Sequence, residues 1–264
     1  MLYYVKADEY LPYDGPKARK EIDALADVWK ADKKPHHQVT TQHAAVNGMM
    51  NGFEKAVWLM GVHSQAAYPA DQVREYTLVH NPSDGFLLDG VESAFDKRQG
   101  QKSHNAQQLA AVMQQCQQLG RRVKWTVHSQ GAIICCAAIE ELQRRGIRIP
   151  GQLLAIHGSG ANLERLVNKA QAVGMQIVGV ANNPFDLVPN LFGSVDRSPS
   201  GLRRSMKFFL ITHVVQPCLY CMRIQPSSRG CSHGQEQGSV SEGSEHKRFY
   251  GEVRHGRAVR ESSL

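Results

Sequence analysis

The sequence predicts an α/β fold, with a mostly parallel central sheet flanked by helices. Short apolar runs rich in β-branched residues recur through the middle of the chain, and turn residues end each of them. Segments with helical spacing of apolar side chains lie between these runs, and three of them end at glycines, Gly120, Gly146 and Gly174. Strands that alternate with helices of this length form βαβ units, whose crossovers place the strands parallel.

The first 43 residues are predicted to be a lead-in to this domain. A loop punctuated by proline and glycine precedes a helix over residues 17–30, whose apolar face consists of Ile22, Leu25, Ala26 and Trp29. Residues 38–48 are predicted to form an extended strand that enters a glycine turn. A further helix is expected to begin at Asn51.

The main domain is predicted to span residues 44–222. Its strands are expected within residues 75–85, 123–128, 152–158 and 175–181. Its helices are expected at residues 87–96, 103–119, 130–145 and 162–173. Helix 103–119 shows the pattern well, because its apolar side carries Leu109, Ala110, Val112, Met113 and Cys116.

The charge of the chain is concentrated toward its carboxyl end. Lys and Arg number 31 against 24 Asp and Glu, a formal net charge of +7. Residues 223–264 are basic, poor in large apolar side chains and rich in Ser, Gly, Arg, Glu and His, so we expect a disordered, solvated tail. Such a tail is compatible with peripheral contact with an anionic membrane. Without recurring aromatic side chains it does not indicate a nucleic-acid partner.

The cysteines and the amino-terminal residues predict the cellular compartment of the protein. Cys116, Cys135 and Cys136 lie in apolar helical patterns, which predicts buried thiols and a reducing environment. The first ten residues lack the features of a signal peptide, and no run approaches the roughly 18 apolar residues of a membrane span. The protein is expected to be cytoplasmic when synthesised, and export without a cleaved signal stays open.

A zinc site is an alternative role for the remaining cysteines. Cys218, Cys221, Cys231 and His233 are a conceivable set of four ligands. The first pair lies in an apolar run, however, and the spacing fits no familiar zinc motif. We therefore expect no metal and no cofactor.

The stretch Val123-Lys-Trp-Thr-Val-His-Ser-Gln-Gly131 is the main candidate for chemistry. It reads as a strand, a sharp turn at Ser129 and the start of a helix, which is the arrangement of a nucleophile elbow. Small residues flank such a serine because larger ones strike the neighbouring strands. Gly131 meets this need, whereas Val127 stands where glycine or alanine is usual. The backbone N–H of Gln130 is placed to stabilise an oxyanion.

Acyl transfer at a serine also needs a histidine base and an orienting acid. Asp186 is the candidate acid, since it lies in the turn after the second predicted strand beyond the elbow. Two histidines compete as the base. His213 is preferred because it ends an apolar run, residues 208–213, predicted to be the last strand, whereas His233 lies in a predicted loop. His128 is interpreted as a packing residue.

Two motifs together resemble those of α/β-hydrolase lipases, in which His-Ser-x-Gly is followed by an Asp-x-Val-Pro acid loop. They are Val127-His-Ser-Gln-Gly131 and Asn183-Pro-Phe-Asp-Leu-Val-Pro189. Residues 46–51 and 80–89 are similar to the corresponding pieces of lipase-like modules in bacterial haemagglutinin-type proteins and secreted toxin effectors. The resemblance covers about residues 44–215. It implies that the loop at Asn47 and Gly48 supplies the second oxyanion donor, and that the substrates are lipid or other carboxylic esters.

The expected function is therefore that of a serine hydrolase. Ser129 would attack a lipid or phospholipid ester, aided by a histidine that Asp186 orients, and water would hydrolyse the resulting acyl-enzyme. The alternative is a catalytically degenerate hydrolase fold that acts as a binding or toxin-delivery module. Val127 and the abrupt change of composition in the tail favour that alternative.

Overall fold

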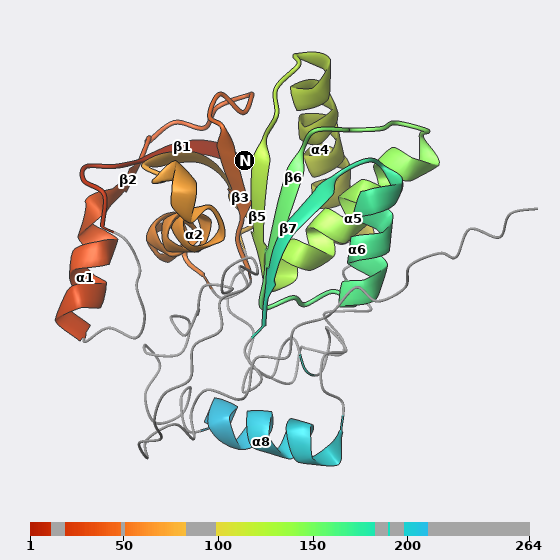
Figure 1. Ribbon diagram of the computed structural model, residues 1–264. Coiled ribbons are helices and arrows are strands. Elements are labelled where there is room, and N and C mark those ends of the chain that lie inside the picture. Colours follow the sequence, from red (N-terminus) through yellow and green to blue (C-terminus); the bar gives the residue numbers. More distant parts are fainter. Residues whose placement is uncertain (12–18, 49–50, 83–98, 183–189, 191–197, 211–264) are drawn as a thin grey trace, which may run out of the picture. The chain divides into compact units, whose positions relative to one another are not determined.

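The computed structural model describes residues 1–11, 19–48, 51–82, 99–182, 190 and 198–210. Its strands form one sheet in the order β2-β1-β4-β3-β5-β6-β7 (Figure 1). Their bounds are β1 (Leu2–Ala7), β2 (Trp29–Ala31), β3 (His43–Val46), β4 (Glu75–Val79), β5 (Lys124–His128), β6 (Leu153–His157) and β7 (Gln176–Ala181). Strands β3 to β7 run parallel, and β1 is antiparallel to both β2 and β4.

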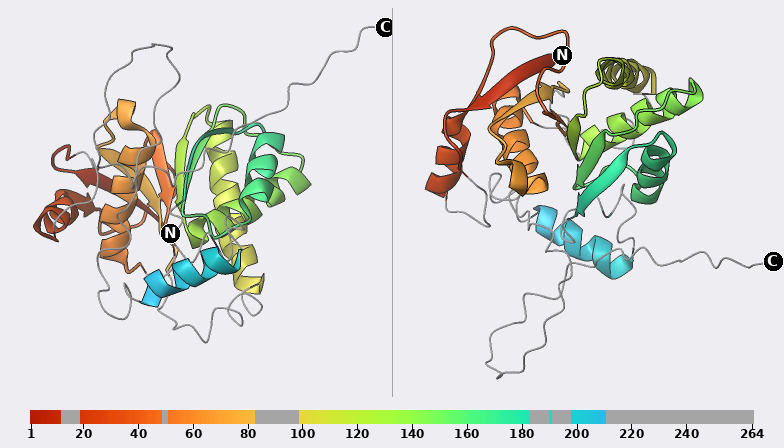
Figure 2. Two further views of the ribbon diagram at one scale, coloured as in Figure 1. Left: turned by 60° about the horizontal axis from the view of Figure 1, so that its bottom comes forward. Right: turned by 45° about the horizontal axis from the view of Figure 1, so that its top comes forward.

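Helices cover both faces of this sheet (Figures 1 and 2). One face carries α1 (Arg19–Val28) and α2 (Phe53–Ala67), and the other carries α4 (Gln99–Gln118), α5 (Gln130–Arg144) and α6 (Leu163–Ala172). A short 3-10 helix, η1 (Pro69–Asp71), precedes β4, and α8 (Pro199–Leu210) follows β7 in the chain. The protein therefore has the predicted α/β-hydrolase-like fold, with a mostly parallel sheet between two helical layers.

Strand β5 shows how the sheet separates its two cores. Successive side chains of a strand point to opposite faces. Trp125 and Val127 belong to the larger apolar cluster, which includes residues of α4, α5 and α6. Thr126 and His128 face α2, where Ser64 Oγ donates to Thr126 Oγ1 over 3.4 Å. Trp125 and Val127 thus face the layer of α4, α5 and α6, and the alternate residues Thr126 and His128 face α2.

The segment predicted to be a lead-in supplies the antiparallel edge of the sheet. Strands β1 and β2 pair with each other, and β1 also pairs with β4. The predicted helix 17–30 ends at Val28, and Trp29 then enters β2. The Trp29 ring lies against Gly61 of α2, where an added Cβ would come within 2.4 Å of the ring. Glycine at position 61 therefore allows β2 to pack close to α2.

Several predicted boundaries are confirmed, and one strand is shorter than expected. Helices α4, α5 and α6 agree with the predicted segments, and the glycines expected after them, Gly120, Gly146 and Gly174, all have positive φ. The strand predicted over residues 38–48 is wrong for its first half, because only His43–Val46 pair as β3. Thr41 instead donates its hydroxyl to the His43 carbonyl over 2.6 Å, a local bond that competes with strand pairing.

The chain divides into two units, and the cysteines of its described part are free thiols. Residues Met1–Ser228 form one unit, and the second, Arg229–Leu264, lies outside the described residues. The prediction that Cys116, Cys135 and Cys136 are buried free thiols is confirmed. Within the described part of the chain, no helix combines the length and the apolar character needed to cross a bilayer.

Candidate active site

Ser129 occupies a strained turn between β5 and α5. Strand β5 ends at His128, α5 begins at Gln130, and the serine between them has φ 52° and ψ −120°. A non-glycine residue rarely adopts a positive φ, and holding it there costs on the order of 1–3 kcal/mol. Among the described non-glycine residues only Gln72 shares this feature. The geometry is the strand, turn and helix of a nucleophile elbow, as the sequence predicts.

Three glycines, one after β3, one in the first turn of α5 and one after β6, let the chain close around this turn. A Cβ added to Gly131 would lie 2.3 Å from the Val46 carbonyl oxygen, and one added to Gly48 would lie 2.7 Å from Ser129 Cβ. A Cβ on Gly160 would lie 2.9 Å from the Ser129 carbonyl oxygen. Real Cβ contacts essentially never fall below 3.0 Å, so larger residues would force the backbone apart at each position.

The backbone of Ser129 is fixed from the β6 side. Its N–H donates to the His157 carbonyl over 3.2 Å, and its carbonyl accepts from the Gly160 N–H over 3.1 Å. The Gly158-Ser-Gly160 turn between β6 and α6 therefore braces the elbow. Its amide at Gly160 is already occupied by the protein.

Val127 does not obstruct the elbow. It is fully buried in the larger apolar cluster and lies between Val46 of β3 and Ile156 of β6 in the sheet register. Its bulk is therefore packed among side chains on the α4, α5 and α6 side of the sheet. The departure from a small residue at this position is accommodated by the core.

The candidate oxyanion donors flank Ser129 on two sides. Gln130 is the first residue of α5, and its N–H makes no hydrogen bond to another described residue. Helix N-terminal amides of this kind favour negative charge. Gly48 follows β3 and lies against Ser129 Cβ, as its close approach shows. The fold thus brings Gly48 and Gln130, which are far apart in the sequence, to the same serine.

A network of side-chain amides connects these two segments. Asn47 Oδ1 accepts from the Asn81 N–H over 2.8 Å, and Asn47 Nδ2 donates to the Asn81 and Gly48 carbonyls over 3.1 and 2.9 Å. Asn81 Nδ2 donates to Gln130 Oε1 over 2.8 Å. Sequence reasoning assigned no role to Asn81, although its place just after a strand of the parallel sheet was a signal for a residue at this edge.

Three histidines lie together beneath the elbow on the α2 side of the sheet. His128 and His157 are direct neighbours in the register of β5 and β6, and His63 of α2 reaches both. The His63 and His157 Nδ1 atoms are 2.9 Å apart and share one proton, while the His63 ring stacks on His128 with centroids 4.5 Å apart. His128 is therefore a packing residue, as predicted.

Burial keeps this histidine cluster neutral. Desolvation lowers the pKa of His128 to about 3 and that of His157 to about 4, and it lowers the pKa of His63 well below its usual value. The neighbouring histidine rings lower the pKa of His63 and of His128 further, since a second positive charge nearby is unfavourable. The described residues contain no group of three His, Cys, Asp or Glu side chains suited to holding a metal ion.

We expect the free energy of unfolding to fall as the pH drops below about 6.5. In the unfolded chain each histidine takes up a proton near that pH, whereas His128 and His157 stay neutral in the folded protein until about pH 3 and 4. The unfolded state binds more protons in this window, so each such histidine removes about 1.4 kcal/mol of stability per pH unit. Urea unfolding between about pH 7 and about pH 4.5 measures the slope.

Variants separate the cluster from the other histidines of the chain. His63→Gln should give a shallower dependence of unfolding free energy on pH, because one depressed histidine is gone. His104→Gln, at an exposed position of α4, is the matched control. A stability that stays level from about pH 6.5 to about pH 4.5 would contradict the prediction.

A second pairing of histidine with aspartate lies at the other end of the strands. His43 Nε2 is 3.1 Å from Asp71 Oδ2, and the same carboxylate oxygen forms an ion pair with Lys124 Nζ. His43 pairs with Lys124 in the sheet, and Ser129 follows five residues later, about 16 Å along a strand. This pair is therefore structural and out of reach of Ser129.

The predicted acid and bases lie outside the described residues. Asp186 follows β7, which ends at Ala181, but its own segment is not described. His213 and His233 are likewise outside. The strand predicted over residues 208–213 is wrong, because residues 208–210 are the last turn of α8. The reason for preferring His213 over His233 therefore no longer holds, and the two histidines stand level as candidates.

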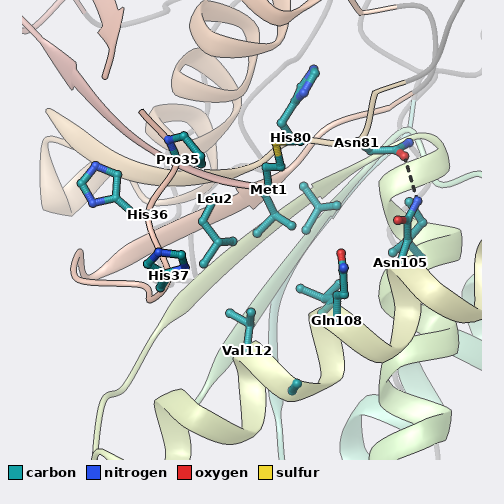
Figure 3. A pocket seen from close by; sticks show the side chains of 15 residues that line it. Met1, Leu2, Pro35, His36, His37, His80, Asn81, Asn105, Gln108 and Val112 are labelled. Atoms are coloured by element: carbon teal, nitrogen blue, oxygen red, sulfur yellow. Dashed lines mark hydrogen bonds between the residues drawn. The ribbon is translucent and has the colours of Figure 1, made fainter. Parts of the chain in front are cut away.

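A cavity of about 430 Å³ adjoins the amide network (Figure 3). Asn81 and Asn105 lie side by side in its wall, with Asn105 Nδ2 3.4 Å from Asn81 Oδ1. Most of its remaining wall is apolar, including Leu2, Val46, Val79, Leu109, Val112 and Ile134. Its wall also carries His36, His37 and His80. Its size lies within the range of small-molecule sites, and a mostly apolar lining with a few polar side chains suits a largely apolar ligand.

Comparisons with known proteins do not assign this chain to a family. No protein-family model and no curated protein matches the sequence. Among solved structures, the crystal structure of Bacillus licheniformis lipase BlEst2 in mature form is similar at 14% identity and a TM-score of 0.30. The match covers 81% of this chain and 66% of that one, so the chain spans just under two thirds of that lipase. A likeness at this level leaves the assignment of function to the site itself.

Proposed function

We propose that this protein is a serine hydrolase that cleaves carboxylic esters, of the lipase or phospholipase class. The observation that supports it most is Ser129 at φ 52° on a turn between β5 and α5, braced by close glycines and followed by a helix N-terminal amide. A strained serine in this setting presents its Oγ to a substrate and places an oxyanion donor beside it.

In the proposed reaction, Ser129 Oγ attacks the ester carbonyl carbon while a histidine takes its proton. His213 or His233 is the proposed base, and Asp186 is the proposed acid that orients it. The oxyanion receives hydrogen bonds from the backbone N–H groups of Gln130 and of the Asn47–Gly48 loop. The histidine then gives its proton to the departing alcohol, and water hydrolyses the acyl-enzyme by the same steps.

The apolar cavity supports an ester with a hydrocarbon acyl group as the substrate. It shares Asn81 with the network that reaches Asn47 and Gln130, although Ser129 and the proposed oxyanion donors are not part of its wall. Each methylene buried there is worth about 0.8 kcal/mol, enough to favour a chain over a short acid.

A fluorophosphonate probe tests the proposal directly, because it reacts with an activated serine and not with an ordinary one. We expect one phosphonyl group per protein, mapped by peptide mass spectrometry to Ser129, and no reaction after heat denaturation. Ser64 and Ser159 are fully buried and serve as internal controls that should stay unmodified. Folded protein that takes up no probe would favour the alternative, a degenerate binding or delivery module.

A further inference from the structure

Asn81 contacts both segments that carry the proposed oxyanion donors. Its backbone N–H and carbonyl pair with the Asn47 side chain, and its own side chain donates to Gln130 Oε1. Asn81 is 7% exposed, Gln130 is 8% exposed and Asn47 is fully buried, so these bonds are shielded from water. Buried hydrogen bonds fix relative positions because neither partner can exchange for water.

The sheet alone does not hold this part of the chain. The ladders that β3 forms with β4 and β5 both end at Val46, opposite Val79 and Val127. Beyond that point the Asn47 side chain takes the place of a strand backbone and pairs with Asn81. The same Nδ2 also donates to the Gly48 carbonyl over 2.9 Å.

We propose that Asn81 is a positioning residue that sets the spacing between Gly48 and Gln130, and hence the width of the oxyanion hole. The inference rests on the proposed hydrolase function. Asn81 does not touch the reacting atoms. It holds Asn47, next to Gly48, on one side and the first residue of α5 on the other, on the two sides of Ser129.

Loss of the Asn81 side chain is expected to lower turnover and to leave substrate binding nearly unchanged. Oxyanion donors act on the charge that develops in the transition state, and losing one costs about 10²- to 10³-fold in kcat. A misplacement of about 1 Å is worth roughly 10²-fold. Removing the Asn81 side chain frees Gln130 from its partner and should therefore lower kcat while KM changes little.

The test uses Asn81→Ala in the full chain, with p-nitrophenyl butyrate as substrate and sites counted by saturating fluorophosphonate labelling. We expect kcat per labelled site to fall by about 10²-fold and KM to stay within about twofold. Asn81→Asp keeps the size of the side chain but replaces the donor to Gln130 by an acceptor. It should act in the same direction, and it decides the question where the alanine variant folds poorly.

Gln65→Ala is the matched control for loss of a buried amide. Gln65 Nε2 donates to the Val73 carbonyl over 3.0 Å, ahead of β4 and away from the elbow. This variant should lose stability as Asn81→Ala does, yet keep kcat per labelled site. A purely structural role for Asn81 predicts the same result for both variants.

A double-mutant cycle with Gln130→Ala tests whether Asn81 acts through Gln130. The double variant should be no slower than the slower single variant, because both changes break one contact. The inference would be overturned if the losses of kcat in the two single variants multiplied in the double variant. It would also be overturned if Asn81→Ala and Asn81→Asp both kept a kcat per labelled site within about threefold of that of the unchanged protein. The hydrolase proposal survives that outcome as long as Ser129 is labelled, so the two failures are distinguishable.

Discussion

Replacing Ser129 with alanine is expected to lower kcat for ester hydrolysis by about 10⁴- to 10⁶-fold. The substitution removes the Oγ nucleophile and leaves the oxyanion donors, so only their weak assistance to direct attack by water remains. Hydrolysis of p-nitrophenyl butyrate, followed over hours at high protein concentration, measures the residual rate. The same variant should fail to react with a fluorophosphonate.

Ser129→Gly is the control that separates loss of chemistry from loss of folding. Glycine adopts φ 52° without strain, so the free energy of unfolding of this variant should be about 1 kcal/mol higher than that of Ser129→Ala. Both variants should be inactive. A gain of stability with a loss of activity is the signature of a strained functional residue. More than about one hundredth of the original activity in either variant would refute a nucleophilic role.

The elbow was predictable because its signals are local. The β-branched run before Ser129, the glycine two residues after it and the periodic helix that ends before Gly146 are all read within one short stretch. The parallel order of β3 to β7 followed from the alternation of strands and helices in the same way.

The edge of the sheet and the last predicted strand were not predictable by the same means. Strand β2 has three residues and continues the apolar period of α1, so its start at Trp29 is visible only once Gly61 and β1 are in place. Residues 208–210 form an apolar run too short to tell a helix from a strand by its period.

Parts of the candidate site depend on contacts between distant residues. Asn47 meets Asn81 because β3 and β4 are neighbours in the sheet, and no spacing in the sequence encodes that register. His63, His128 and His157 meet because two of them lie at one level on one face of the sheet, below the same helix. Such groups emerge only when the topology is known.

Gly131→Ala is expected to destabilise the protein by about 3 kcal/mol and to reduce hydrolysis by 10²-fold or more. Alanine normally stabilises a helix relative to glycine, by about 1 kcal/mol, so the sign is reversed here. The reason is the Val46 carbonyl oxygen, which would lie 2.3 Å from the new Cβ. A backbone atom cannot turn aside as a side chain can, so α5 and the end of β3 must separate.

Gly179→Ala provides the matched control, because nothing lies within 4 Å of a Cβ at that position in β7. It should leave both stability and activity close to their original values. Val46 directly precedes Asn47, so the movement that relieves the clash at Gly131 also carries the Asn47–Gly48 loop away from Ser129. Stability and turnover should therefore fall together in Gly131→Ala, measured by urea unfolding and by kcat per labelled site. A stable Gly131→Ala protein with normal turnover would mean that β3 and α5 are not in contact at the elbow.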